Sequence, residues 1–263
     1  MPVLRHCLAV LLCAALLPAG AAFACPPDAR PAPALATDLR AASRAQGRPL
    51  AILAIGSSST AGVGASLGFP ARLARRLVEA WGQGSVEVVN AGVSGESSPS
   101  TLQRLEAFMA HKPAPDLVIW QVGTNDVIFG NSPAGLGASV GRGLDAIAAA
   151  GARVIVIDQQ YFPGIMDVPK YETFVAAVRD AAAARRAPLL PRYAMMKQWA
   201  ARDPEGFRGL FSWDRFHMND AGYACLADLL AFAILAAGGP SAPAPAAAPA
   251  PGQARQKPAA RPQ

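Results

Sequence analysis

The chain has 263 residues, of which 52% are hydrophobic and 16% charged, so it suits a globular domain with a sizeable core and is not a disordered chain. Its formal net charge is +6, but the balance falls to 20 basic against 18 acidic residues without the four basic residues nearest the ends, Arg5, Arg255, Lys257 and Arg261. Because no Lys/Arg cluster with interleaved aromatic residues remains, nucleic acid is not an expected partner.

Residues 1–24 have the pattern of a secretory signal peptide. A basic start precedes an apolar stretch at 7–17, and the small-residue sequence Ala-Phe-Ala follows at 22–24. The apolar stretch is too short to span a bilayer. A lipid attached to Cys25 is the alternative, although the residues before it match a lipobox poorly. We therefore expect a periplasmic or secreted protein with no transmembrane span in its mature chain.

Strand-like and helix-like segments alternate after a Pro- and Ala-rich arm that ends in a short helix at 37–46. Short apolar or β-branched runs predict strands at 50–55, 85–90, 117–122, 154–158 and 188–193. Apolar periodicity with Pro at several starts predicts helices at 70–81, 99–109, 137–150, 170–186 and about 219–236.

This alternation predicts an α/β fold, a three-layer α/β/α sandwich with a five-stranded parallel sheet in the flavodoxin-like order. The expected organisation is a signal peptide at 1–24, an arm with a short helix at 25–48, one folded domain at 49–238 and a disordered tail at 239–263. The tail is almost entirely Pro, Ala and a few charged residues, so it cannot bury a core.

Four short segments carry the residue types that ester hydrolysis needs, and three of them directly follow predicted strands. Parallel strands bring their carboxyl ends to one edge of the sheet, where ligands bind in open α/β folds. Ester hydrolysis needs a nucleophile, a base, a group that orients the base, and donors for the oxyanion. The segments are Ser57-Ser58-Ser59, the loop with Gly95, Gly123-Thr124-Asn125-Asp126, and Asp214-Arg215-Phe216-His217.

His217 is the candidate base. Of the three histidines, His6 leaves with the leader, and His111 precedes a strand and so lies at the opposite edge of the sheet. Asp214 stands three residues before His217, so its carboxylate can orient the imidazole toward a serine. The alternatives are a surface or capping histidine and, for the serines, an ordinary Ser/Gly-rich turn.

Over residues 50–235 the chain resembles the SGNH (GDSL-type) hydrolases. The family's first block is Gly-Asp-Ser, and here it reads Gly56-Ser57-Ser58, so the resemblance assigns the nucleophile to Ser58. Ser57 replaces the Asp of that motif, which is not one of the family's catalytic residues. The second block's glycine corresponds to Gly95.

The third and fourth blocks of the family are also present. Gly-x-Asn-Asp matches residues 123–126, and Asp-x-x-His matches 214–217. The resemblance therefore implies a Ser58, His217 and Asp214 triad, with an oxyanion hole formed by the backbone N–H groups of Ser58 and Gly95 and by the Asn125 amide. It implies no metal and no cofactor.

The resulting hypothesis is an exported serine esterase that acts on a small-molecule or polysaccharide-borne ester. There are two alternatives. A glycan O-acetyltransferase uses the same catalytic residues, and a non-catalytic SGNH-fold module would bind glycans without being an enzyme. The loops at 127–135 and 161–169 are expected to line the pocket. Aromatic and apolar residues at 161, 162, 165 and 166 either contact the substrate or pack inside the protein.

Two cysteines remain after removal of the leader, Cys25 and Cys225. Because an exported protein meets an oxidising compartment, we expect them to form a disulfide. The alternatives are a buried, inert Cys225 and a lipidated Cys25.

Overall fold

A five-stranded parallel sheet forms the centre of the protein in the computed structural model, which describes residues 25, 35, 38–111 and 113–237. The strand order is β2 (Val86–Gly92), β1 (Leu50–Gly56), β3 (Leu117–Gln121), β4 (Arg153–Ile157) and β5 (Leu189–Leu190), and every neighbouring pair is parallel. The flavodoxin-like order is therefore confirmed.

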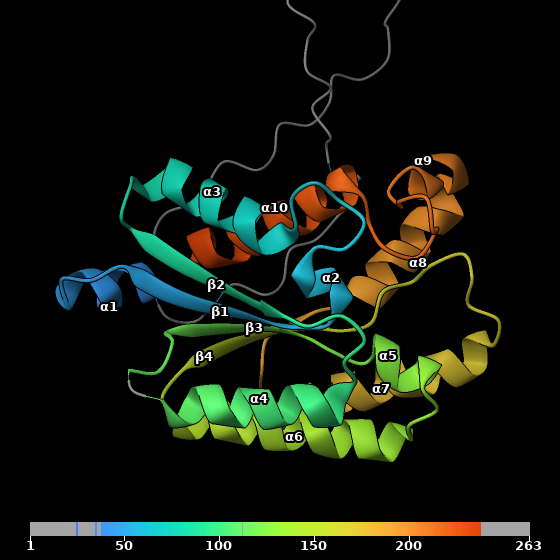
Figure 1. Cartoon of the computed structure of the whole chain (residues 1–263), viewed down its shortest axis with the longest axis horizontal. Helices are drawn as coiled ribbons and strands as arrows, with labels where there is room; N and C mark the ends of the chain where they lie inside the picture. Colours follow the sequence, from blue (N-terminus) through green and yellow to red (C-terminus); the bar gives the residue numbers. More distant parts are fainter. Residues whose placement is uncertain (1–24, 26–34, 36–37, 112, 238–263) are drawn as a thin grey trace, which may run out of the picture.

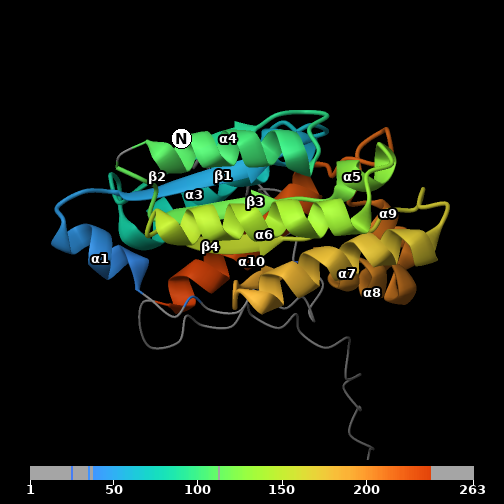
Figure 2. The same ribbon diagram turned by 90° about the horizontal axis from the view of Figure 1, so that it is seen from below.

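Helices cover both faces of the sheet (Figure 1). Figure 2 shows the face covered by α4 (Ser98–Ala110), α6 (Pro133–Ala149) and α7 (Val168–Ala184). The other face carries α3 (Phe69–Trp81), α8 (Arg192–Arg202) and α10 (Asp220–Ala236). The shorter helices are α1 (Leu39–Ala45), α2 (Ser58–Ala61), α5 (Thr124–Ile128) and α9 (Pro204–Arg208).

The hydrophobic core is divided by the sheet into two clusters. On β1, Leu50, Ile52 and Ala54 belong to the cluster under α3 and α10, whereas Leu53 and Ile55 belong to the cluster under α4 and α6. This alternation follows from the two-residue period of a strand. Because both faces are buried, the strand shows the continuous apolar run that the sequence displays.

The prediction of a strand at residues 188–193 was wrong in part. The fifth strand has two residues instead of the six expected at 188–193, and the chain enters α8 directly after Pro191. The buried Asp158 side chain accepts the N–H of Tyr193 through Oδ1 and so satisfies one N–H of the first turn of that helix. Asp158 directly follows β4 and is far from Tyr193 in the sequence, so the local pattern carried no sign of this contact. The helix expected at 137–150 is α6, and it begins earlier than expected, at Pro133. Ser132 caps it by accepting the N–H of Gly135.

A disulfide joins Cys25 to Cys225, with 5.0 Å between their Cα atoms, as expected from the sequence. It attaches the segment before α1 to α10 across 200 positions. The proposed signal peptide and the Pro/Ala tail lie outside the described residues. Within the described part of the chain, the helices are too short or too polar to cross a membrane.

Candidate active site

Ser58 is the first residue of α2, immediately beyond the carboxyl end of β1. At the same edge, α2 passes very close to β2, and glycine makes this approach possible: a Cβ on Gly92 would lie 2.1 Å from the backbone nitrogen of Ala61. Figure 1 shows α2 at the end of the sheet where α5 also begins. Ser58 therefore follows the end of β1 directly, and the last residues of its short helix pack against the backbone of β2.

Ser58, His217 and Asp214 form one hydrogen-bonded line. His217 Nε2 lies 2.8 Å from Ser58 Oγ, and His217 Nδ1 lies 2.6 Å from Asp214 Oδ2. The side chains of His217 and Asp214 are 15% and 22% exposed, so the line stands at the surface yet is largely shielded from water. Of the three consecutive serines, Ser58 is the one whose hydroxyl is hydrogen-bonded to His217.

Asp214 is held as a carboxylate. Its partial burial on its own would raise its pKa, but hydrogen bonds from the His217 ring, from the backbone N–H groups of Phe216 and His217, and from the Ser212 hydroxyl outweigh this effect. Together they lower the pKa of Asp214 far below the usual value for an aspartate. A permanently charged carboxylate fixes which ring nitrogen carries the proton and stabilises the imidazolium.

The loop that carries Asp214 and His217 is locally closed. Phe211 and Met218 form an antiparallel bridge, and the Ser212 N–H donates to the His217 carbonyl at 2.8 Å. Asn219 then caps α10 by accepting the N–H groups of Ala221 and Gly222. The six residues enclosed by the bridge, 212–217, must turn tightly, and Arg215 adopts a left-handed conformation with φ of 57°.

The three predicted oxyanion donors also lie at this edge. The Ser58 N–H is at the first position of a helix, where no intrahelical acceptor exists. Gly95 has φ of +83° with open space at its missing Cβ, so its backbone conformation rather than crowding favours glycine. The Asn125 amide donates one N–H to the Glu96 carbonyl at 2.8 Å, which fixes the amide beside the Gly95 loop and leaves its second N–H for a ligand.

Asp126 organises the loop beneath these donors, a function that the sequence reasoning did not assign. Its buried carboxylate accepts the N–H and the hydroxyl of Ser98 and the side-chain amide of Asn131. These bonds attach the start of α4 to α5 and thus hold the Gly95 loop against Asn125. The available signal in the sequence was the aspartate that ends the 123–126 block.

The expected pocket residues divide into packed and exposed ones. Tyr161 packs against Tyr193 and Phe207, and Phe162 packs against Phe216 with ring centroids 4.9 Å apart. Met166, by contrast, is 98% exposed. The sequence had not singled out Trp213, which is 92% exposed and immediately precedes Asp214.

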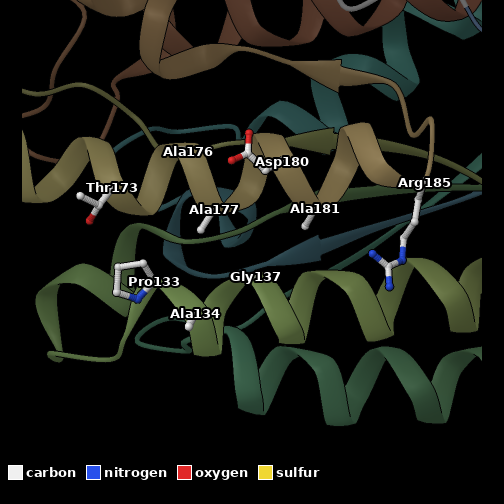
Figure 3. Close-up of a pocket in the computed structure, with 9 residues that line it drawn as sticks. All are labelled: Pro133, Ala134, Gly137, Thr173, Ala176, Ala177, Asp180, Ala181 and Arg185. Carbon is white, nitrogen blue, oxygen red and sulfur yellow. The ribbon is translucent and has the colours of Figure 1, made fainter.

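A hollow of about 420 Å³ lies elsewhere, between α6 and α7 (Figure 3). Small residues line most of it, including Ala134, Gly137 and Ala177, and the Arg185 guanidinium at one end is paired with Asp145. It contains no serine–histidine pair. His111 caps the end of α4 at the opposite edge of the sheet from Ser58. Among the described residues, no group of three His, Cys, Asp or Glu side chains is arranged to hold a metal ion.

Comparisons with known proteins identify the family of this chain. The model of the non-GDSL lipase-like family matches residues 24–238. The esterase TesA of Pseudomonas aeruginosa is 33% identical over 144 residues, which are 53% of this chain and 69% of TesA.

Solved structures show the same architecture. A crystal structure of TesA aligns with a TM-score of 0.57 and 27% identity, covering 68% of this chain and 94% of that one. The SGNH-hydrolase family esterase AlinE4 aligns with a TM-score of 0.54 and 25% identity, over 73% and 97% of the two chains. A mutant of Axe2, an acetyl-xylooligosaccharide esterase from Geobacillus, aligns with a TM-score of 0.59 at 19% identity over 74% and 96%, which indicates a shared fold.

Proposed function

The chain belongs to the non-GDSL lipase-like family and is an SGNH-type ester hydrolase, and on this premise we propose that it is an exported serine esterase in which Ser58, His217 and Asp214 carry out the reaction. The observation that supports this assignment is the position of His217, which contacts Ser58 with one ring nitrogen and Asp214 with the other.

In the proposed reaction, Ser58 Oγ attacks the ester carbonyl while His217 Nε2 takes the hydroxyl proton. Asp214 stabilises the imidazolium that results. The carbonyl oxygen becomes an oxyanion held by the N–H groups of Ser58 and Gly95 and by the free N–H of the Asn125 amide. His217 then gives its proton to the leaving alcohol, and a water activated by the same ring hydrolyses the acyl-enzyme.

The proposed substrate presents an apolar group to the rim of the site. Among the described residues, seven large hydrophobic side chains are exposed, and six of them lie at this edge of the sheet, namely Val63, Val93, Ile128 at the end of α5, Phe129, Met166 and Trp213. The seventh, Val89, lies on the edge strand β2. Apolar side chains gathered around a reactive centre are typical of a ligand-binding surface. They favour esters with an aliphatic or aromatic part, whether small molecules or groups borne on a polysaccharide.

Export is supported by the leader pattern at 1–24 and by the use of Cys25 in a disulfide. Stable disulfides are typical of oxidising compartments, and a cysteine whose sulfur forms a disulfide cannot also carry a thioether-linked lipid. We therefore propose a periplasmic or secreted protein that begins near Cys25. Cell fractionation combined with the intact mass of the mature protein tests this proposal: an added diacylglycerol at Cys25 would contradict it.

The esterase proposal is tested by turnover of a series of p-nitrophenyl esters from acetate to palmitate, by the wild-type protein and by Ser58→Ala. We expect hydrolysis by the wild type, a chain-length optimum, and none above background by Ser58→Ala. Product analysis with a glycan acceptor present separates hydrolysis from acetyl transfer. Transfer that exceeds hydrolysis would replace the esterase by the acetyltransferase alternative, and no turnover of any ester would favour a binding module.

A further inference from the structure

The carbonyl of Phe216, the residue directly before His217, is held by a buried side chain from another part of the fold. Gln160 Nε2 donates to this carbonyl at 2.7 Å. Gln160 itself lies just beyond β4 and is 1% exposed. The loop from Asp214 to His217 is therefore held by two contacts. The Asp214 carboxylate accepts backbone N–H groups within the loop, and Gln160, just beyond β4, binds the loop to the sheet.

Gln160 is in turn fixed by Arg192 at the start of α8. Arg192 Nη2 donates to Gln160 Oε1 at 2.8 Å, and the whole arginine side chain is 2% exposed. The Tyr171 hydroxyl from α7 also donates to the backbone carbonyl of Gln160 at 2.8 Å. Both the backbone and the side chain of Gln160 are thus held by buried donors.

The chemistry of these partners allows only one orientation of the Gln160 amide. A guanidinium only donates, so the atom facing Arg192 must be the amide oxygen, and the atom facing the Phe216 carbonyl must then be the NH₂ group. An arginine side chain is costly to bury, and Arg192 Nε and Nη1 have no hydrogen-bond partner among the described residues. The energetic cost of burying Arg192 beside the residue that holds the His217 loop points to a function for this arginine.

We propose that Gln160, oriented by Arg192, is a positioning residue that holds His217 at hydrogen-bond distance from Ser58. This inference rests on the proposed function of the triad. Because the Phe216 carbonyl and the His217 ring belong to adjacent residues, movement of this carbonyl changes the distance between His217 Nε2 and Ser58 Oγ. Gln160 contacts this loop at Phe216, next to the histidine, and not at the exposed rim residues, so we expect the effect on kcat rather than on KM.

Gln160→Glu tests the bond most directly. The glutamate has the same shape and keeps an oxygen for Arg192, but it removes the N–H donor and places a second oxygen against the Phe216 carbonyl. Gln160→Met, which keeps the volume and lacks both hydrogen bonds, is the second variant. Arg192→Lys keeps the charge and can restore part of the contact that Arg192→Met removes. Tyr193→Phe, which removes a hydrogen bond to Glu172 from the next residue of α8, is the matched control.

We expect Gln160→Glu and Gln160→Met to lower kcat by about ten- to a hundredfold, the size of effect that a misplacement near 1 Å produces, with KM within twofold of the wild type. Arg192→Lys should retain more kcat than Arg192→Met, and Tyr193→Phe should leave kcat unchanged. Proton NMR gives a readout independent of turnover: the His217 ring N–H bonded to Asp214 should broaden or shift in the Gln160 variants and not in Tyr193→Phe.

The proposal is overturned if Gln160→Glu keeps the wild-type kcat and ring N–H signal, or if Tyr193→Phe loses as much kcat as Gln160→Glu. Ser58→Ala separates this failure from failure of the proposed function. If Ser58→Ala is inactive and the Gln160 variants are normal, only the positioning function is wrong. If Ser58→Ala is active, the triad assignment is wrong, and the NMR comparison still reports whether Gln160 orients the ring.

Discussion

His217 Nε2 lies 2.8 Å from Ser58 Oγ although the two residues are 159 positions apart in the chain. The serine comes from the end of β1 and the histidine from the loop before α10, so neither segment alone contains a reactive pair. The parallel sheet and the closed 211–218 loop together bring the two side chains into contact. Much of what can be tested about this protein follows from that contact.

Ser58→Ala should lower kcat for p-nitrophenyl esters by about four to six orders of magnitude, the range seen when a triad member is removed. Ser57→Ala and Ser59→Ala are matched controls because they remove the same hydroxyl one residue away, and both should keep most of the activity. If Ser57→Ala or Ser59→Ala loses activity while Ser58→Ala keeps the wild-type activity, the nucleophile is the neighbouring serine and not Ser58. Circular dichroism shows whether each variant is folded.

Asn125→Ala should reduce kcat by about 10²–10³ with a smaller change in KM, because one oxyanion donor acts mainly in the transition state. The Glu96 carbonyl that accepts the other N–H of this amide keeps it aimed at the site. Gln103→Ala, which removes an exposed amide on α4, should leave kcat unchanged. An unaltered kcat in Asn125→Ala would show that the amide does not contact the oxyanion.

Asp158→Asn should remove a pH dependence of stability. Burial raises the pKa of Asp158 to about 7, and the Tyr193 N–H and the Arg192 charge offset this only in part. Between about pH 4 and 7 the folded protein keeps the Asp158 proton while an unfolded aspartate, with a pKa of about 3.9, loses it. The free energy of unfolding therefore falls as pH rises through this window, by on the order of 4 kcal/mol at most.

The measurement is the Tm of the wild type and of Asp158→Asn from pH 4.5 to 8. The wild type should lose stability toward pH 8 and the variant should not, whereas Asp180→Asn on the exposed surface should behave like the wild type. The depressed pKa of Asp214 acts in the other direction and only below about pH 4, where protonation of that carboxylate removes its stabilising bonds. Parallel curves for wild type and Asp158→Asn would contradict the prediction.

Reduction of the Cys25–Cys225 disulfide, or Cys25→Ser, should lower the free energy of unfolding by up to about 5 kcal/mol, the chain-entropy value for a loop of this length. Cys25→Ser is the better variant because Cys225 is buried in the core. Intact mass after alkylation without reductant should show no modified thiol in exported protein. Two alkylated cysteines would show that the bridge does not form.

Trp213→Ala should raise KM for esters with longer acyl chains by about fivefold, since roughly 40 Å² of apolar contact is worth about 1 kcal/mol. The kcat for the acetate ester should stay near that of the wild type. Val89→Ser is the control because it removes an exposed hydrophobic side chain that lies away from the site. Equal effects of the two variants would show that the rim does not contact the substrate.

The sequence by itself determined the fold class, the order of the sheet and the four segments of the site. A short, continuous apolar run such as 50–55 indicates a strand whose two faces are both buried, as in a sheet with helices on each side. Parallel strands place their carboxyl ends at one edge of the sheet. The resemblance to a known family then indicated Ser58, Gly95, Asn125, Asp214 and His217. Each stands in a short sequence motif, which can be recognised without knowing the long-range contacts of the fold.

Only the tertiary structure decided what holds those residues in place. The start of α8 depends on Asp158, the Gly95 loop depends on Asp126, and the His217 loop depends on Gln160 and Arg192. Each is a hydrogen bond from or to a side chain whose partner, a second side chain or a backbone group, is distant in sequence, so no local period or motif encodes it. Whether an aromatic residue such as Phe162 packs or faces the substrate is settled in the same way, by which neighbours the fold brings within contact distance.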